Sequence, residues 1–269
     1  MLALGGDAFP HDTQTLRTAL ALGAQRHGAG ADAVNTGGNF PSLDLLQMNL
    51  TGVRLDSHAV ITAAGESGGG FFSRAFDIVA EPALLGDVPV CVALHAEDCV
   101  FAFGTAADGA RTVSLKNCAT GTLDVSAATA DIEGALLALA RDAASGHGAE
   151  VESVRLTLDA ESPRTIAVSA VAVAKAMFFT ATLTIRGRIA VDGDFNLRLH
   201  DATCTGDGML ANLAAAQLRP RLTELQGRTF SLRTFLPPGL RPADVALSGG
   251  AALRVTASFS GDGPQSGGK

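Results

Sequence analysis

The segment Gly65-Glu66-Ser67-Gly68-Gly69 matches the G-x-S-x-G pattern that surrounds the nucleophile of many serine hydrolases. In those enzymes the glycines permit a sharp turn from a strand into a helix, which exposes the serine oxygen above the sheet. The residues after Ser67, GGGFFSRAFDIVAEP, instead resemble a glycine loop followed by a strand. Asp98 and His200 could be nominated as partners, but any chain of this length offers an acid and a histidine. We therefore interpret Gly65 to Gly70 as a flexible connection, and a serine hydrolase using Ser67 stays an alternative.

A second candidate lies in the segment CVALHAEDC, where Cys91, His95 and Cys99 are spaced by four residues. On a regular strand this spacing points all three side chains to one face, and zinc accepts thiolate and imidazole ligands. However, the spacing is not that of a C-x-x-C pair, and a fourth ligand has to come from elsewhere. Because cysteines in apolar strands are usually buried as small hydrophobic residues, we predict no metal site and reduced thiols.

Other polar clusters do not predict a cofactor. Asp56, Ser57 and His58 have the composition of a catalytic triad, but neighbours on a strand face opposite sides, so a polar strand edge is the simpler interpretation. The glycine clusters lack the spacing of a phosphate-binding loop or of a dinucleotide fingerprint. We therefore expect neither a nucleotide nor any other cofactor.

Composition excludes some classes of function. The 269 residues carry a formal charge of -7 and include no Trp or Tyr, although they include thirteen Phe. The acidic balance opposes a basic surface for phosphates, and the amphipathic aromatic residues Trp and Tyr that often stack on bases are missing. Nucleic acid is therefore not an expected partner. Hydrophobic residues make up 47% of the chain against 17% charged, which favours a folded chain with a sizeable core.

Three segments have the apolar spacing of amphipathic helices, namely residues 12–27, 131–145 and 209–226. The first begins at Asp12, a preferred N-cap residue, and the third contains Pro220, where we expect a kink. The remaining segments alternate in part between apolar and polar residues and are separated by Gly/Asp turn signals, which is typical of antiparallel strands. One such signal, Asp192-Gly193, predicts a hairpin between residues 189–191 and 195–197.

The order of these elements predicts an α+β fold in which a strongly curved antiparallel β-sheet wraps around two amphipathic helices. A weak internal repeat supports this. When a gap of one residue is allowed, Leu115, Asn117 and Gly121 align with Leu199, Asp201 and Gly206. We expect a single domain over residues 1–259, made of two pseudo-repeats at approximately 43–150 and 151–259. Residues 260–269 read as a flexible tail.

The chain also resembles a known family. Its leading helix, LTGVRLDSHAVI, TADIEGALLALAR, the segment LTIRGRIAVDGDFNLRLHDATCTGDGMLANLAAAQLRPRL and the closing FLPPGLRPADVALSGGAALRVTASF follow the order of the LmeA-like domain. The resemblance spans roughly residues 12–259 and includes Gly187, Gly206, Pro237 and Gly239. It implies an architecture similar to tubular lipid-binding proteins and a phospholipid ligand, without a catalytic signature. The chain departs from the family in lacking a signal or anchor at its start and in its GESGGG loop.

These observations predict a non-enzymatic lipid-binding or lipid-transfer protein that holds acyl chains in an apolar groove between sheet and helices. The expected lining is aliphatic and aromatic, and consists of Ile132, Leu136, Leu139, Phe178, Leu213, Leu218 and Leu222. The alternative is an interaction or assembly subunit in which the same residues form a packed core, since a core and a ligand groove are lined by the same types of residue.

The expected partners are a phospholipid or another apolar ligand, with peripheral membrane contact and a protein partner as further alternatives. No stretch of the sequence has the length and hydropathy of a signal peptide or a membrane span, so we expect a soluble mature chain. A plastid or a cytoplasmic location both stay open, as does the removal of an upstream targeting segment.

Overall fold

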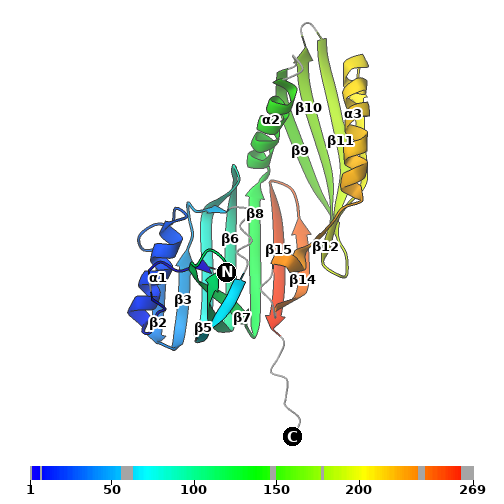
Figure 1. Cartoon of the computed structure of the whole chain (residues 1–269). Coiled ribbons are helices and arrows are strands. Elements are labelled where there is room, and N and C mark those ends of the chain that lie inside the picture. The colour runs from blue at the N-terminus through cyan, green and yellow to red at the C-terminus, as the bar shows by residue number, and fades with distance from the viewer. Residues whose placement is uncertain are drawn as a thin grey trace. The chain divides into compact units, whose positions relative to one another are not determined.

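A computed structural model describes residues 2–6, 8–55, 63–145, 150–176, 179–235 and 240–261. Within these residues the fold is α+β, as predicted, with three α-helices and two open β-sheets (Figure 1). Packing divides the chain into two compact units, one of residues 1–125, 234–244 and 256–269 and one of residues 126–233 and 245–255. The single domain and the pseudo-repeats expected from the sequence stay predictions. No helix in the described residues combines the length and hydropathy needed to cross a membrane.

The first unit is built on a ten-stranded sheet with the order β14-β15-β8-β6-β5-β3-β2, where β7 also pairs with β6, β1 with β7 and β4 with β5. The division between the units falls within β8, β14 and β15. The elements are β1 (Leu2–Ala3), α1 (Thr13–Gln25), β2 (Val34–Asn39), β3 (Ser42–Asn49), β4 (Arg54–Leu55), β5 (Ala63–Leu85), β6 (Val88–Ala106), β7 (Arg111–Asn117), β8 (Thr120–Ala128), β14 (Leu240–Ser248) and β15 (Ala252–Gly261).

Helix α1 confirms the first predicted helix, together with its cap. The carboxylate of Asp12 accepts the N–H of Thr15 at 2.7 Å, and the Thr15 hydroxyl accepts the N–H of Asp12 at 3.2 Å. This reciprocal pair satisfies two N–H groups that would otherwise be free at the start of the helix. The hydrogen bond from the Thr15 backbone also lowers the pKa of Asp12. Leu16 and Leu20, four residues apart, are buried in the core of the unit.

Four phenylalanines of β5 and β6 form the aromatic part of this core. Phe71 stacks on Phe101 with ring centroids 4.7 Å apart, and Phe76 meets Phe101 edge-on at 5.1 Å. Phe103 packs against Phe71 at 5.9 Å, and all four rings are at most 4% exposed. The first unit therefore has a well-buried apolar core formed by its sheet and α1.

The glycine segment around Ser67 is not the flexible connection that the sequence predicted. Residues from Ala63 onward belong to strand β5, which pairs with β6, and the pairing is irregular between Glu66 and Gly70. Gly69 has a φ of 100°, and a Cβ on Gly70 would lie 2.0 Å from the Phe101 carbonyl oxygen. The glycines thus permit a bulge and a close approach within a strand, where the sequence suggested a loop.

Two pairings depart from the antiparallel pattern that the sequence suggested, because β3 and the short β4 both run parallel to β5. Residues 50–62 separate β3 from β5, which is long enough for the crossover that parallel neighbours require. A parallel pair gives no separate signal in a sequence of half-buried strands, since its alternation is the same.

The second unit contains a five-stranded antiparallel sheet with the order β13-β12-β11-β10-β9 and two helices. Its elements are α2 (Thr129–Ser145), β9 (Glu150–Ser162), β10 (Thr165–Ala176), β11 (Phe179–Val191), β12 (Asn196–Asp207), α3 (Met209–Gln226) and β13 (Thr229–Ser231), followed by a 3-10 turn (Leu232–Phe235). Helices α2 and α3 confirm the second and third predicted helices, and Pro220 lies inside α3.

The hairpin predicted at Asp192-Gly193 is confirmed between β11 and β12, although its loop has four residues. The carboxylate of Asp192 accepts the N–H groups of Asp194 and Asn196, each at 2.9 Å. These hydrogen bonds also lower the pKa of Asp192, and the one from the Asn196 backbone has the largest effect. Phe195 closes the loop with a φ of 61°, and its buried ring lies near the guanidinium groups of Arg164 and Arg233.

We predict that Phe101→Ala destabilises the first unit by about 3–5 kcal/mol, because it removes a buried ring in contact with two others and leaves a cavity. Denaturant unfolding measures the loss. Its matched control is Val100→Ala, one residue earlier on β6 and 45% exposed, which should change stability far less. Equal losses in the two variants would contradict the assignment of Phe101 to the core.

Candidate functional site

The sheet of the second unit has one face made almost entirely of aliphatic side chains. Residues paired across an antiparallel ladder share a face, so the register sorts the side chains into two sets. Ala170 of β10 is paired with Leu156 of β9 and Ile185 of β11, and Ala172 is paired with Val154 and Leu183. We call this surface the apolar face, and define it as Val154, Leu156, Leu158, Ala170, Ala172, Ala174, Ala181, Leu183 and Ile185.

Burial of the apolar face is uneven. Leu156 and Leu158 of the edge strand are buried. The side chains on the two middle strands, from Ala170 to Ala174 and from Ala181 to Ile185, are only partly buried. In the first unit, the corresponding inward side chains of β3, β5 and β6 are almost fully covered. No described residue of the second unit therefore covers the middle of its apolar face to the density of a core.

The two helices leave the middle uncovered because each one packs along an edge of the sheet, α2 against β9 and α3 chiefly against β12 (Figure 1). On one edge, the Glu133 carboxylate accepts the N–H of Leu156 at 2.6 Å, and Arg141 Nε donates to the carbonyl of Val151 at 2.8 Å. These side chains satisfy backbone groups that have no neighbouring strand.

The opposite edge is held in the same way. Arg219 Nε of α3 donates to the carbonyl of Cys204 at 3.3 Å, and Gln226 Nε2 donates to the carbonyl of Ala202 at 3.2 Å. Ala211 and Ala215 of α3 are buried, which brings the helix backbone close to β12. A Cβ on Gly206 would lie 2.3 Å from the Ala211 carbonyl oxygen, so this approach requires a glycine.

The predicted site residues of α2 lie beside its β9 contact. At about 100° per residue, Ile132, Leu136 and Leu139 form one stripe, roughly a third of a turn from the side that carries Glu133 and Arg141. α2 runs antiparallel to β9, because Glu133 contacts Leu156 and the later Arg141 contacts the earlier Val151. In a right-handed helix with this direction, the stripe lies on the side of the sheet to which the Leu156 side chain points. Ile132 and Leu136 are partly buried, and Leu139 is 67% exposed. The three residues therefore border the apolar face.

The predicted residues of α3 do not share one side of the helix. Leu218 and Leu222 are partly buried on the side that packs against β12. Leu213 lies nine residues before Leu222, half a turn away around the helix, and is 61% exposed. Leu225 is 40% exposed and lies nearer the apolar face, although the sequence did not single it out for the site.

Phe178, the remaining predicted residue, lies outside the described residues. Sequence reasoning also missed the strand side chains, chiefly Ala172, Leu183 and Ile185. Their signal was in the two runs TIAVSAVAVAKA and FTATLTIRGRIAV. In each run one alternate set of residues contains no polar side chain.

The expectation that Cys91, His95 and Cys99 share one face is wrong. Asp98 has a φ of 51°, and the alternation of buried and exposed residues reverses there. His95 and Cys91 are consequently exposed, whereas Cys99 is buried. No group of three or more potential ligands among the described residues could hold a metal ion.

His95 instead pairs with carboxylates on the exposed side of the hairpin. Its Nδ1 lies 2.6 Å from Asp77 Oδ1, directly across the ladder, and its Nε2 lies 3.8 Å from Glu97 Oε1. The hydrogen bond with Asp77 raises the pKa of His95. This pair is exposed on a strand surface without a described nucleophile in contact, so we assign it no catalytic role.

The other polar candidates find no catalytic arrangement in the described structure. Ser67 lies within strand β5, which continues to Leu85, and not at the strand-to-helix turn that a nucleophile elbow needs. The nominated partners Asp98 and His200 belong to different units. Asp56, Ser57 and His58 lie outside the described residues.

Comparison with known proteins adds no relative. No family model, no curated protein and no solved structure matches this chain. The resemblance to the LmeA-like domain therefore stays a prediction, and the candidate site rests on the geometry of the second unit.

We predict that one thiol per chain reacts rapidly with an aromatic disulfide reagent at pH 8, and that this thiol is Cys91. The thiolate is the reactive form, and burial raises the pKa of Cys99 to about 12 and also raises those of Cys118 and Cys204. Cys91 is the exposed cysteine. Absorbance of the released thiolate counts the fast thiols. The fast phase should disappear in Cys91→Ser and four thiols should react in denaturant; a second fast thiol in the folded chain would contradict the burial.

Proposed function

We propose that the chain is a non-enzymatic lipid-binding protein that holds acyl chains on the apolar face of the second unit, between α2 and α3. The observation that supports this most directly is that the middle of an almost entirely aliphatic face is left partly exposed. A purely structural sheet face of this composition would normally be buried against another layer. An apolar ligand can supply that layer.

The size and composition of the face suit an acyl chain. From Ala170 to Ala174 the strand extends about 13 Å, at roughly 3.3 Å per residue. Each methylene transferred from water onto such a surface contributes about 0.8 kcal/mol, so a few methylenes give appreciable affinity without a charged contact. The stripe of Ile132, Leu136 and Leu139 provides an apolar border on the α2 side.

Under this proposal the sheet curves around its ligand with the helices as side walls, which is the wrapped arrangement that the sequence suggested. Phospholipid is the ligand class that the LmeA-like resemblance implies. Leu213 has no lining role in this arrangement, because it lies on the side of α3 away from the Leu222 contact.

We predict that Leu183→Asp abolishes lipid uptake, because it places a charge in the middle of the apolar face. Thr184→Asp is the matched control, since Thr184 is the next residue on β11, is also partly buried and points to the opposite face. Native mass spectrometry of each purified variant, before and after incubation with phosphatidylcholine, measures the bound lipid per chain. Organic extraction of the untreated protein identifies any lipid that co-purifies.

Uptake by the wild type and by Thr184→Asp, together with loss in folded Leu183→Asp, supports the proposal. If the wild type carries no lipid and takes up none, the lipid-binding proposal fails and the assembly-subunit alternative leads. Equal uptake by all three proteins would place the lipid elsewhere than on this face.

A further inference from the structure

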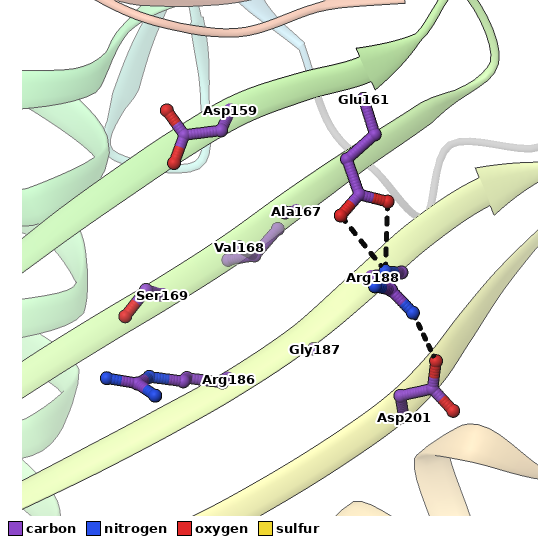
Figure 2. Close-up of a pocket in the computed structure, with 9 residues that line it drawn as sticks. All are labelled: Asp159, Glu161, Ala167, Val168, Ser169, Arg186, Gly187, Arg188 and Asp201. Carbon is purple, nitrogen blue, oxygen red and sulfur yellow. Dashed lines mark hydrogen bonds and ion pairs between the residues drawn. The ribbon is translucent and has the colours of Figure 1, made fainter.

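The opposite face of the same sheet is mostly polar, although Val171 and Val173 also belong to it, and it carries a hollow of about 340 Å³. We call it the polar-face hollow; its lining comes from β9, β10, β11 and β12 (Figure 2). Two central lining residues have small side chains on this face, Ala167 and Ser169 of β10. Gly187 of β11, between Arg186 and Arg188, contributes backbone to the lining. Longer charged side chains surround them, so the hollow is a direct product of residue size on neighbouring strands.

One side of the hollow is a closed ion-pair cluster. Arg188 Nε lies 2.9 Å from Glu161 Oε2, and Arg188 Nη1 lies 2.9 Å from Asp201 Oδ2. The hydrogen bond with Glu161 is the main cause that raises the pKa of Arg188. The Arg188 guanidinium is thus held by carboxylates from two other strands. This fixes its position on one side of the hollow and leaves Arg188 little capacity to bind a further anion.

The other side of the hollow carries two charges of opposite sign. Figure 2 shows Ser169 between Asp159 and Arg186, apart from the cluster around Arg188. Among the residues that the structure describes, neither Asp159 nor Arg186 has an ion-pair partner. All the charges at the hollow, three carboxylates and two guanidinium groups, sum to -1, which disfavours a lone anion.

We propose that the polar-face hollow binds a small zwitterion of the aminoalkyl phosphate class. Its ammonium group pairs with Asp159, its phosphate with Arg186, and Ser169 donates a hydrogen bond between them. Arginine suits the anionic end because its planar fork matches phosphate oxygens. β9 and β11 are two strand spacings apart, about 10 Å. Asp159 is in register with Ala167 and Arg186 with Ser169, so the two residues are also offset by two positions along the strands. The two side chains and a short zwitterion together can span this separation. The hollow is also within the size range of small-molecule sites.

The test uses O-phosphoethanolamine and isothermal titration calorimetry on the full chain. We expect one site, with affinity at least about tenfold weaker in Arg186→Gln and in Asp159→Asn, because each loses a charge-assisted hydrogen bond. Arg155→Gln is the matched control on the polar face of β9 outside the hollow, and it should bind as the wild type does. Ala167→Leu keeps every charge but fills the floor, and should also abolish binding.

Two ligand fragments test the class of ligand. Ethylamine and inorganic phosphate alone should each bind at least about tenfold more weakly than O-phosphoethanolamine, since each engages one of the two charges. Phosphate binding as tight as that of the zwitterion would overturn the proposal in favour of a plain anion site. Absence of binding to the wild type, or equal binding to Arg186→Gln and Asp159→Asn, would overturn it altogether.

A final arm separates a lipid headgroup from a free molecule. Vesicles of phosphatidylethanolamine in phosphatidylcholine are floated with the protein, with and without excess O-phosphoethanolamine. Competition supports a headgroup as the source, whereas flotation that the soluble ligand leaves unchanged, with calorimetric binding intact, supports a free molecule. Because Leu183 is on the other face, Leu183→Asp should keep this binding, so failure here is distinguishable from failure of acyl-chain uptake.

Discussion

Backbone hydrogen bonding at the two edges of the second sheet determines where its helices lie. A strand at an edge has N–H and C=O groups without a neighbouring strand, and leaving them unsatisfied near apolar surface is costly. Glu133 and Arg141 of α2, and Arg219 and Gln226 of α3, supply these partners from helix side chains. α2 is consequently fixed along β9, and α3 along the part of β12 that β13 does not pair with. The middle strands receive little helical cover.

The two units therefore bury similar apolar residues to different extents. In the first unit, α1 and the sheet bury Leu16, Leu20 and the phenylalanines of β5 and β6 in one core. In the second, alanine, leucine and isoleucine on β10 and β11 are kept partly exposed. Composition cannot distinguish a packed core from a partly exposed face, because an aliphatic strand has the same sequence pattern whether a helix, a ligand or solvent lies against it. The difference arises from the placement of the helices.

Much of the local structure could be predicted from the sequence, because its causes are local. Asp12 caps α1 through a residue three positions away, and the periodicity of residues 209–226 gave both ends of α3. The Asp192-Gly193 hairpin likewise depends on neighbours in the chain. Features with distant causes could not be predicted. Position 70 requires a glycine because the carbonyl of Phe101 lies against it, and Cys99 is buried because the alternation of β6 reverses at Asp98, which has a positive φ.

The candidate site was predictable only in part for the same reason. Helical spacing identified Ile132, Leu136 and Leu139 as one stripe, but the choice of Leu213 assumed which side of α3 faces the sheet. That side is set by Ala211 and Ala215, whose small size lets the helix approach Gly206. Strand register, which a sequence specifies weakly, decided that Leu183 and Ile185 belong with Ala170 and Ala172.

The directions of the elements give the second unit a two-fold pattern that its chain order does not have. α2 and β9 are antiparallel neighbours at one edge, β12 and α3 are antiparallel neighbours at the other, and β10 and β11 are antiparallel between them. A half-turn about an axis normal to the sheet exchanges the two sets of directions. An elongated molecule lying along the middle strands would meet equivalent backbone from either end. Its orientation would be decided by side chains alone, by the alanines of β10 against Leu183 and Ile185 of β11.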